Sequence, residues 1–147
     1  MKTILFAAAL SLTTFSSAIA NKTSKQKTFT VAATHSFEKE FGTVAEVNWS
    51  TTATNMLRAS FKQDDESVSA FFDQSGNYVA TTVNRTAESL PAKLRAAINK
   101  KEKDGIITEA VEFTSDDEQS YYVKVYVNGK EKLYKGSSIG QITQVNY

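Results

Sequence analysis

The sequence predicts an α+β fold made of two tandem αββββ modules, with both helices packed on one face of an antiparallel sheet. Two stretches carry apolar residues three or four positions apart, which is the spacing of one helix face. Eight short runs have strand-forming residues, and apolar and polar positions alternate most clearly in residues 56–62 and 67–73. Few residues separate neighbouring runs, which favours antiparallel hairpins. We expect one domain over residues 29–147, divided into modules 29–85 and 86–147.

Residues 1–20 predict a removable export signal. Lys2 supplies a positive start, residues 4–12 are apolar, and Ala18-Ile19-Ala20 has the small residues of a cleavage site. The apolar stretch is too short to span a bilayer. We therefore expect cleavage near Ala20 and a periplasmic or secreted protein. Residues 21–28 are polar and basic without an apolar period, so we expect a disordered leader there.

The composition excludes several classes of function. Lys2 is the one charged residue of the signal, so its removal lowers the 17 Lys and Arg to 16, equal to the 16 Asp and Glu. A neutral domain gains no long-range attraction to nucleic acid or anionic lipid, so we expect neither as a partner. No other apolar run approaches membrane length, so we expect no membrane span. The chain has no cysteine, which excludes disulfides and thiolate sites.

The first module begins with a predicted helix over residues 31–41. Phe37 and Phe41 are four positions apart and share a helix face, and Gly42 follows as a C-terminal stop. Four strands are predicted after this helix, over residues 44–49, 56–62, 67–73 and 78–83.

The second module begins with a predicted helix over residues 86–103. Pro91 falls in its first turn, where a missing N–H costs nothing. Leu90, Leu94, Ala97 and Ile98 form the apolar stripe of this helix. In the strands that follow, Asn128-Gly129 predicts a two-residue hairpin, because both residues tolerate positive φ. The predicted strands are residues 106–113, 121–127, 131–135 and 141–147.

A pattern of packing and turn residues spans the predicted domain. It runs Phe37-x-x-x-Phe41-Gly42, Val47-x-Trp49, Ala59-x-Phe61, Val68-x-Ala70-x-Phe72-Asp73-x-x-Gly76 and Leu90-Pro91. This pattern resembles the PepSY-like family of exported Bacteroidetes proteins, whose fold is similar to that of the β-lactamase inhibitor protein. The resemblance implies a tandem helix-and-antiparallel-sheet fold, a periplasmic or outer-surface location and no established enzymatic activity.

His35 is the only histidine, and its surroundings in the sequence do not predict catalysis. A catalytic triad needs a base held by a carboxylate, with a nucleophile within reach. Residues 136–140, Gly-Ser-Ser-Ile-Gly, have the spacing G-x-S-x-G, but they join two predicted strands, whereas the turn that presents a nucleophile leads from a strand into a helix. We therefore expect His35 on a solvated helix surface, and we expect neither enzymatic activity nor a cofactor.

Two acidic triplets suggest an alternative function, in which the protein binds Ca²⁺ or a small ligand. Residues 64–66 and 116–118 both read Asp-Asp-Glu, and carboxylate oxygens are ligands that Ca²⁺ prefers. Neither triplet matches an EF-hand loop, and each lies in a predicted hairpin turn, where Asp is favoured anyway. We therefore expect solvated turns without a metal. The basic residues between 93 and 103 are likewise expected on a solvated helix face.

Aromatic and basic side chains alternate with apolar ones in the predicted strand 121–127. If the apolar set faces the helices, then Tyr122, Lys124 and Tyr126 face away from them. Helices on one face leave the other open, and tyrosines with basic neighbours are typical of a partner surface. The alternative is that cross-strand tyrosine pairs only stabilise an exposed sheet. The candidate contact residues, from three strands, are Tyr122, Lys124, Tyr126, Lys132, Tyr134 and Phe71.

Together these observations predict a non-catalytic exported binding or inhibitor-like module that contacts an unidentified protein of the cell envelope. The β-lactamase inhibitor protein grips its enzyme with a concave aromatic sheet face and projecting loops. Those contact loops have no match in this chain, so the resemblance does not imply lactamase inhibition.

Overall fold

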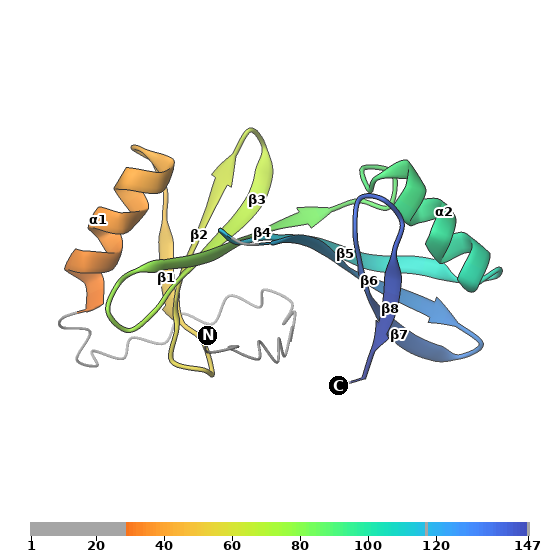
Figure 1. Cartoon of the computed structure of the whole chain (residues 1–147). Coiled ribbons are helices and arrows are strands. Elements are labelled where there is room, and N and C mark those ends of the chain that lie inside the picture. The colour runs from red at the N-terminus through yellow and green to blue at the C-terminus, as the bar shows by residue number, and fades with distance from the viewer. Residues whose placement is uncertain (1–28, 117, 147) are drawn as a thin grey trace.

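The computed structural model describes residues 29–116 and 118–146, which form two helices and eight strands (Figure 1). The expected export signal, 1–20, and the expected leader, 21–28, lie outside the described residues. The first half consists of α1 (Phe29–Phe41), β1 (Asn48–Thr51), β2 (Leu57–Gln63), β3 (Glu66–Phe72) and β4 (Tyr78–Arg85). The second half consists of α2 (Ala92–Lys101), β5 (Ile106–Thr114), β6 (Gln119–Val127), β7 (Lys130–Gly136) and β8 (Ile142–Val145).

All eight strands belong to one sheet, in which each strand pairs with the next along the chain. Every pairing is antiparallel, and β4 pairs with β5 to join the two halves. The expected α+β class and the repeated αββββ order are therefore confirmed. In the part of the chain that the structure describes, no helix has the length and apolar character needed to cross a membrane.

Both helices lie on the same side of the sheet because one set of alternating residues faces them along the strands. In the first half, Leu57 lies opposite Phe72, and both are buried. In the second half, Val123 lies opposite Tyr134, and both are again buried. Between β4 and β5, Arg85 lies opposite Ala110, which is buried under α2, so the residues of β4 that face the helices pair with those of β5 that face them. Figure 1 shows that the sheet arches, with α1 and α2 on its outer side.

Each helix covers a hydrophobic core of its own, and the two cores share no residue. The first core is rich in aromatic rings, because α1 contributes Phe37 and Phe41 where α2 contributes aliphatic side chains. The buried residues of the first core are Ala33, Phe37, Leu57, Ala59, Phe61, Val68, Ala70 and Phe72. Those of the second core are Leu90, Leu94, Ile98, Ala110, Tyr121, Val123, Val125 and Tyr134.

Two hairpins close with the tight turns that the sequence predicts. Asn128 (φ 51°) and Gly129 (φ 74°) both have positive φ between β6 and β7. Asp64 (φ 49°) and Asp65 (φ 65°) do the same between β2 and β3. Positive φ at both central residues is the mark of a type I′ turn, whose twist suits antiparallel strands.

Two predicted element boundaries are wrong by more than two residues. The first strand was expected over residues 44–49, but β1 begins only at Asn48. Val44 and Val47 still pack against the first core, because this segment carries the chain from α1 to the sheet without pairing to β2.

The second helix was expected from residue 86, but α2 begins at Ala92. Thr86 and Ser89 bond to each other through backbone and side-chain atoms, and so form a separate turn before the helix. Pro91 has an extended ψ of 132° and is the residue just outside the helix, so it does not lie within the first turn.

Candidate functional site

The face of the sheet opposite the helices, which we call the open face, carries aromatic and charged side chains in the second half of the molecule. On β6, the residues that alternate with Tyr122, Lys124 and Tyr126 are buried in the second core. Successive side chains of a strand point to opposite faces, so these three lie on the open face, as their phase predicts. Tyr126 is 46% exposed, and Tyr122 and Lys124 are half-buried.

Tyr122 lies between an aromatic neighbour on β5 and a cation on β7. The Phe113 and Tyr122 rings are 6.3 Å apart in an edge-to-face arrangement, which is favourable for aromatic pairs. Lys135 lies opposite Tyr122, with its Nζ 6.0 Å from the ring centroid. The Glu118 carboxylate accepts a 2.5 Å bond from Lys135, and this bond is the largest cause of a raised Lys135 pKa. Tyr122 therefore has a charged border on the side of β7.

Tyr126 pairs across the strands with Ile106, which is 66% exposed. Between this pair and Tyr122, Lys124 forms a 2.6 Å ion pair with Glu109. Apolar side chains thus alternate with a neutralised charge along β5 and β6. Val111, which pairs with Tyr122, belongs to the same row but is only 5% exposed. We call the four apolar members that remain more accessible the open-face strip: Ile106, Phe113, Tyr122 and Tyr126.

Phe71 also lies on the open face, but in the first half. It is half-buried and pairs with Arg58 on β2 and with Ala80 on β4. Because β4 separates β3 from β5, Phe71 is two strands from Phe113. The sheet therefore places Phe71 on the predicted face without making it part of the strip.

The expected placement of Lys132 and Tyr134 on this face is wrong. The two-residue turn pairs Val127 with Lys130, and the register then places Tyr134 opposite Val123 and Lys132 opposite Val125. Both residues consequently face the helices, and Tyr134 is only 1% exposed.

Lys132 and Tyr134 instead hold the end of α2 to the sheet. Lys132 Nζ donates to both Glu102 carboxylate oxygens, at 2.9 and 3.0 Å, and the Tyr134 hydroxyl donates to Glu102 Oε1. The hydrogen bond from Tyr134, followed by that from Lys132, lowers the pKa of Glu102. Burial, together with the adjacent carboxylate, raises the pKa of Tyr134 to about 12. Since every polar group in this cluster is paired within the second core, its role is structural.

The raised Tyr134 pKa predicts a loss of stability at alkaline pH. The folded protein keeps the Tyr134 proton above pH 10, the ordinary pKa, whereas the unfolded chain releases it. The stabilisation is therefore complete below pH 10 and is lost as the pH rises towards 12. Titration by tyrosinate absorbance, combined with unfolding curves, should show this step. If Tyr134→Phe leaves the titration and the stability unchanged between pH 10 and 12, the cluster is wrongly described.

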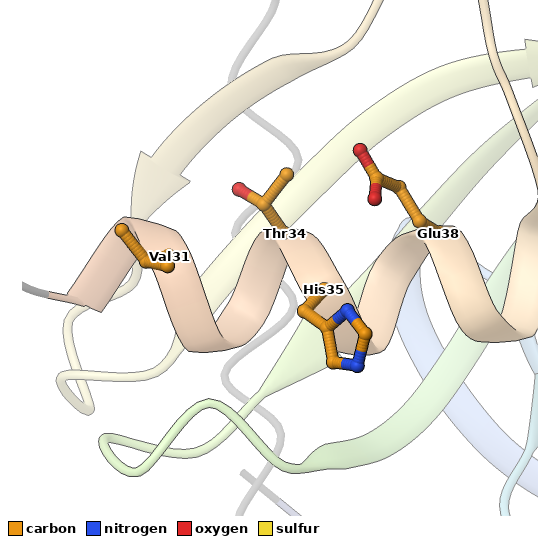
Figure 2. A pocket seen from close by; sticks show the side chains of 4 residues that line it. All are labelled: Val31, Thr34, His35 and Glu38. Atoms are coloured by element: carbon orange, nitrogen blue, oxygen red, sulfur yellow. The ribbon is translucent and has the colours of Figure 1, made fainter.

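His35 is exposed on α1, as expected, and contributes to a shallow hollow of about 470 Å³. The described lining residues, Val31, Thr34, His35 and Glu38, all belong to this one helix. Figure 2 shows these side chains spaced along α1, with His35 and Glu38 pointing apart. Among these four side chains, the one carboxylate, that of Glu38, therefore does not face the imidazole of His35.

The acidic triplets do not converge. Asp64 and Asp65 form the β2–β3 turn, and Glu118 is paired with Lys135 at the other hairpin. Among residues 29–116 and 118–146, no three His, Asp or Glu side chains are close enough together to hold a metal ion.

The residues around Tyr122 and Tyr126 that were not singled out from the sequence include Ile106, Phe113 and Lys135. Phe113 and Ile106 lie in a predicted strand whose phase was not assigned, because a bulge between Ile107 and Glu109 interrupts its alternation. Lys135 could have been found from the turn, since a two-residue loop at Asn128-Gly129 places it opposite Tyr122.

No protein-family model matches the chain, and no curated protein matches it in sequence. Solved structures do match its fold. A Bacteroides eggerthii protein whose name proposes a periplasmic location is 16% identical, with a TM-score of 0.70, and the match covers 79% of this chain and 87% of that one. A DUF2874 family protein from Bacteroides uniformis is 15% identical, with a TM-score of 0.70 and coverage of 76% and 84%.

A third match is named for the inhibitor itself. A BLIP-like protein from Bacteroides fragilis is 16% identical, with a TM-score of 0.69, over 78% of this chain and 83% of that one. At such low identity the likeness concerns the fold. The chain therefore has the fold shared by these BLIP-like and DUF2874 proteins of Bacteroides, as the resemblance to the β-lactamase inhibitor protein implies.

Proposed function

We propose that this protein is a non-catalytic exported binding module that contacts a partner protein of the cell envelope through the open-face strip. The observation that carries the proposal is the exposure of Tyr126 and Ile106 beside the Phe113–Tyr122 pair, on a face that neither helix covers. Tyrosines in such positions are frequent anchors of protein interfaces, because they bury a large area while losing little side-chain freedom.

The charges around the strip also suit a binding surface. Lys124 and Lys135 are already paired with Glu109 and Glu118, so a partner that covers the apolar residues need not bury an unpaired charge. Export is supported by the signal that the sequence predicts at residues 1–20 and by the periplasmic name of one protein of the same fold. The BLIP-like name of another supports an inhibitor-like mode of binding.

The double substitution Tyr122→Ala/Tyr126→Ala tests the proposal. We expect it to reduce recovery of a specific partner from an envelope extract of the source bacterium at least tenfold, because each anchor tyrosine contributes about 2 kcal/mol. Quantitative mass spectrometry of the captured proteins provides the measurement.

The matched control is Ile139→Ala, which removes a side chain that is 63% exposed in the β7–β8 turn, outside the strip. The control should capture the same partner as the unmodified protein. Equal recovery of every protein by the double variant would show that the tyrosines only stabilise the sheet.

A further inference from the structure

The two hydrophobic cores remain separate at the junction between the halves, and they share none of their buried residues. In the sheet the junction consists of five residue pairs, from Thr81 opposite Thr114 to Arg85 opposite Ala110. The register shifts once on each side of it, between β3 and β4 and between β5 and β6. Such irregularities bend a sheet and increase its twist. The angle between the halves is therefore not set by one hydrophobic core that spans both of them.

On the helix side of the junction, charged side chains take the place of a core. Arg85 Nε donates to Glu112 Oε2 at 2.7 Å, and Arg85 Nη1 donates to Glu66 Oε1. Gln119 Nε2 donates to the other Glu112 oxygen, Oε1, at 2.6 Å. We call these four residues, which come from β3, β4, β5 and β6, the junction network: Glu66, Arg85, Glu112 and Gln119.

The geometry of this network resists rotation of one half against the other. The guanidinium of Arg85 is planar and holds one carboxylate from each half, so both bonds are directional. The Arg85 and Glu112 side chains are only 22% and 13% exposed, so solvent screens their pair less than an exposed one. Burial acts to lower the pKa of Arg85, but the bond to Glu112 and the charges of both carboxylates raise it.

We propose that the junction network is a clamp that fixes the angle between the two halves and so sets the curvature of the open face. Neighbouring strands differ in twist over a range of about 25°, so the backbone pairing alone permits rotation. A rotation of about 10° moves a point about 20 Å away by about 3–4 Å. The same rotation changes, by a smaller distance, how Phe71 in the first half lies relative to Tyr122 in the second. The consequence for binding rests on the function proposed above, whereas the clamp itself does not.

Distances between spin labels test the clamp directly. The chain has no cysteine, so Lys39→Cys on α1 and Lys100→Cys on α2, both exposed positions, provide two specific labelling sites. Pulsed electron resonance should give one narrow distance distribution for the labelled parent. With Arg85→Leu we expect the distribution to broaden by half or more, or its maximum to shift by about 3 Å or more. Arg85→Lys should broaden it as well, because an ammonium has no fork to hold both carboxylates.

The matched control is Arg95→Leu, since Arg95 lies on α2 and donates to the Glu88 carbonyl oxygen, which is not part of the junction network. This control should keep the narrow distribution. Glu66→Gln is a second variant that retains the fold, because Glu66 is about half exposed, and it should broaden the distribution less than Arg85→Leu. An unchanged distribution in folded Arg85→Leu, or in Glu66→Gln if Arg85→Leu does not fold, would overturn the clamp. Failure of the tyrosine variants to lose a partner would overturn only the proposed function.

Discussion

Phe37→Ala is expected to lower the free energy of unfolding by about 3–5 kcal/mol, because it removes the ring that joins α1 to the sheet. The centroid of the Phe37 ring lies 5.0 Å from that of Phe61, 5.8 Å from Trp49 and 6.4 Å from Phe72. It also lies 5.1 Å from the Phe41 ring on the same helix. Removal therefore leaves a cavity lined by other rings, which cannot collapse without moving the helix. Denaturant unfolding followed by tryptophan fluorescence measures the effect.

The matched control for this prediction is Phe71→Ala, the same substitution on the open face. Phe71 is half-buried and lies outside the first core, so we expect a loss of about 1 kcal/mol. Similar losses for the two variants would contradict the assignment of the two faces.

Gly76→Ala is expected to lower the free energy of unfolding by about 2–4 kcal/mol. Gly76 has φ +85°, a conformation that a residue with a Cβ rarely adopts. The added Cβ would also lie 2.6 Å from the Ala32 Cβ and 2.7 Å from the Ala33 backbone nitrogen, both in α1. The β3–β4 turn could accept the methyl group only by moving away from the helix.

Gly129→Ala separates the cost of a positive φ from the cost of the close contact with α1. Gly129 has φ +74°, but no other residue lies within 4 Å of the point where an added Cβ would sit. Its substitution therefore carries the conformational cost alone, about 1–2 kcal/mol. The difference between the two unfolding free energies then measures the contact between the β3–β4 turn and α1. An equal loss for both variants would show that α1 does not pack against this turn.

The parts of the fold that the sequence predicts are those set by local chemistry. Apolar residues four positions apart locate α1, and the alternation of residues in 67–73 correctly places Val68, Ala70 and Phe72 in the first core. Asn128-Gly129 forms the turn that its tolerance of positive φ predicts. Helix boundaries are harder to place, because Pro91 is compatible both with the first turn of α2 and with the position just before it.

The error at Tyr134 arises from strand register. A shift of one residue moves a whole strand to the opposite face, so a correct strand can still be given the wrong face. The turn determines the register. Pairing Val127 with Lys130 places Lys135, the neighbour of Tyr134, opposite Tyr122, so Tyr134 must face the other side. Register counted from the turn would have exchanged Lys132 and Tyr134 for Lys135 in the candidate surface.

Other contacts could not be predicted from the sequence, because they join residues far apart in the chain. The bond from Tyr134 to Glu102 spans 32 positions, and that from Arg85 to Glu112 spans 27. Both depend on which strands pair and in what register, and the bond to Glu102 also depends on the position where α2 ends. Local sequence patterns do not predict such long-range pairs, so nothing in the sequence distinguishes Glu102 and Arg85 from ordinary surface charges.

The most direct test asks whether the open face of the sheet is accessible to a partner. Hydroxyl radicals oxidise accessible tyrosines of the folded protein, and mass spectrometry measures the rate at each one. Among the four tyrosines of β6 and β7, Tyr126 should react fastest and Tyr122 next, while Tyr121 and Tyr134 should stay protected until the protein unfolds. Reaction of Tyr134 as fast as that of Tyr126, or protection of Tyr122 equal to that of Tyr121, would contradict the account.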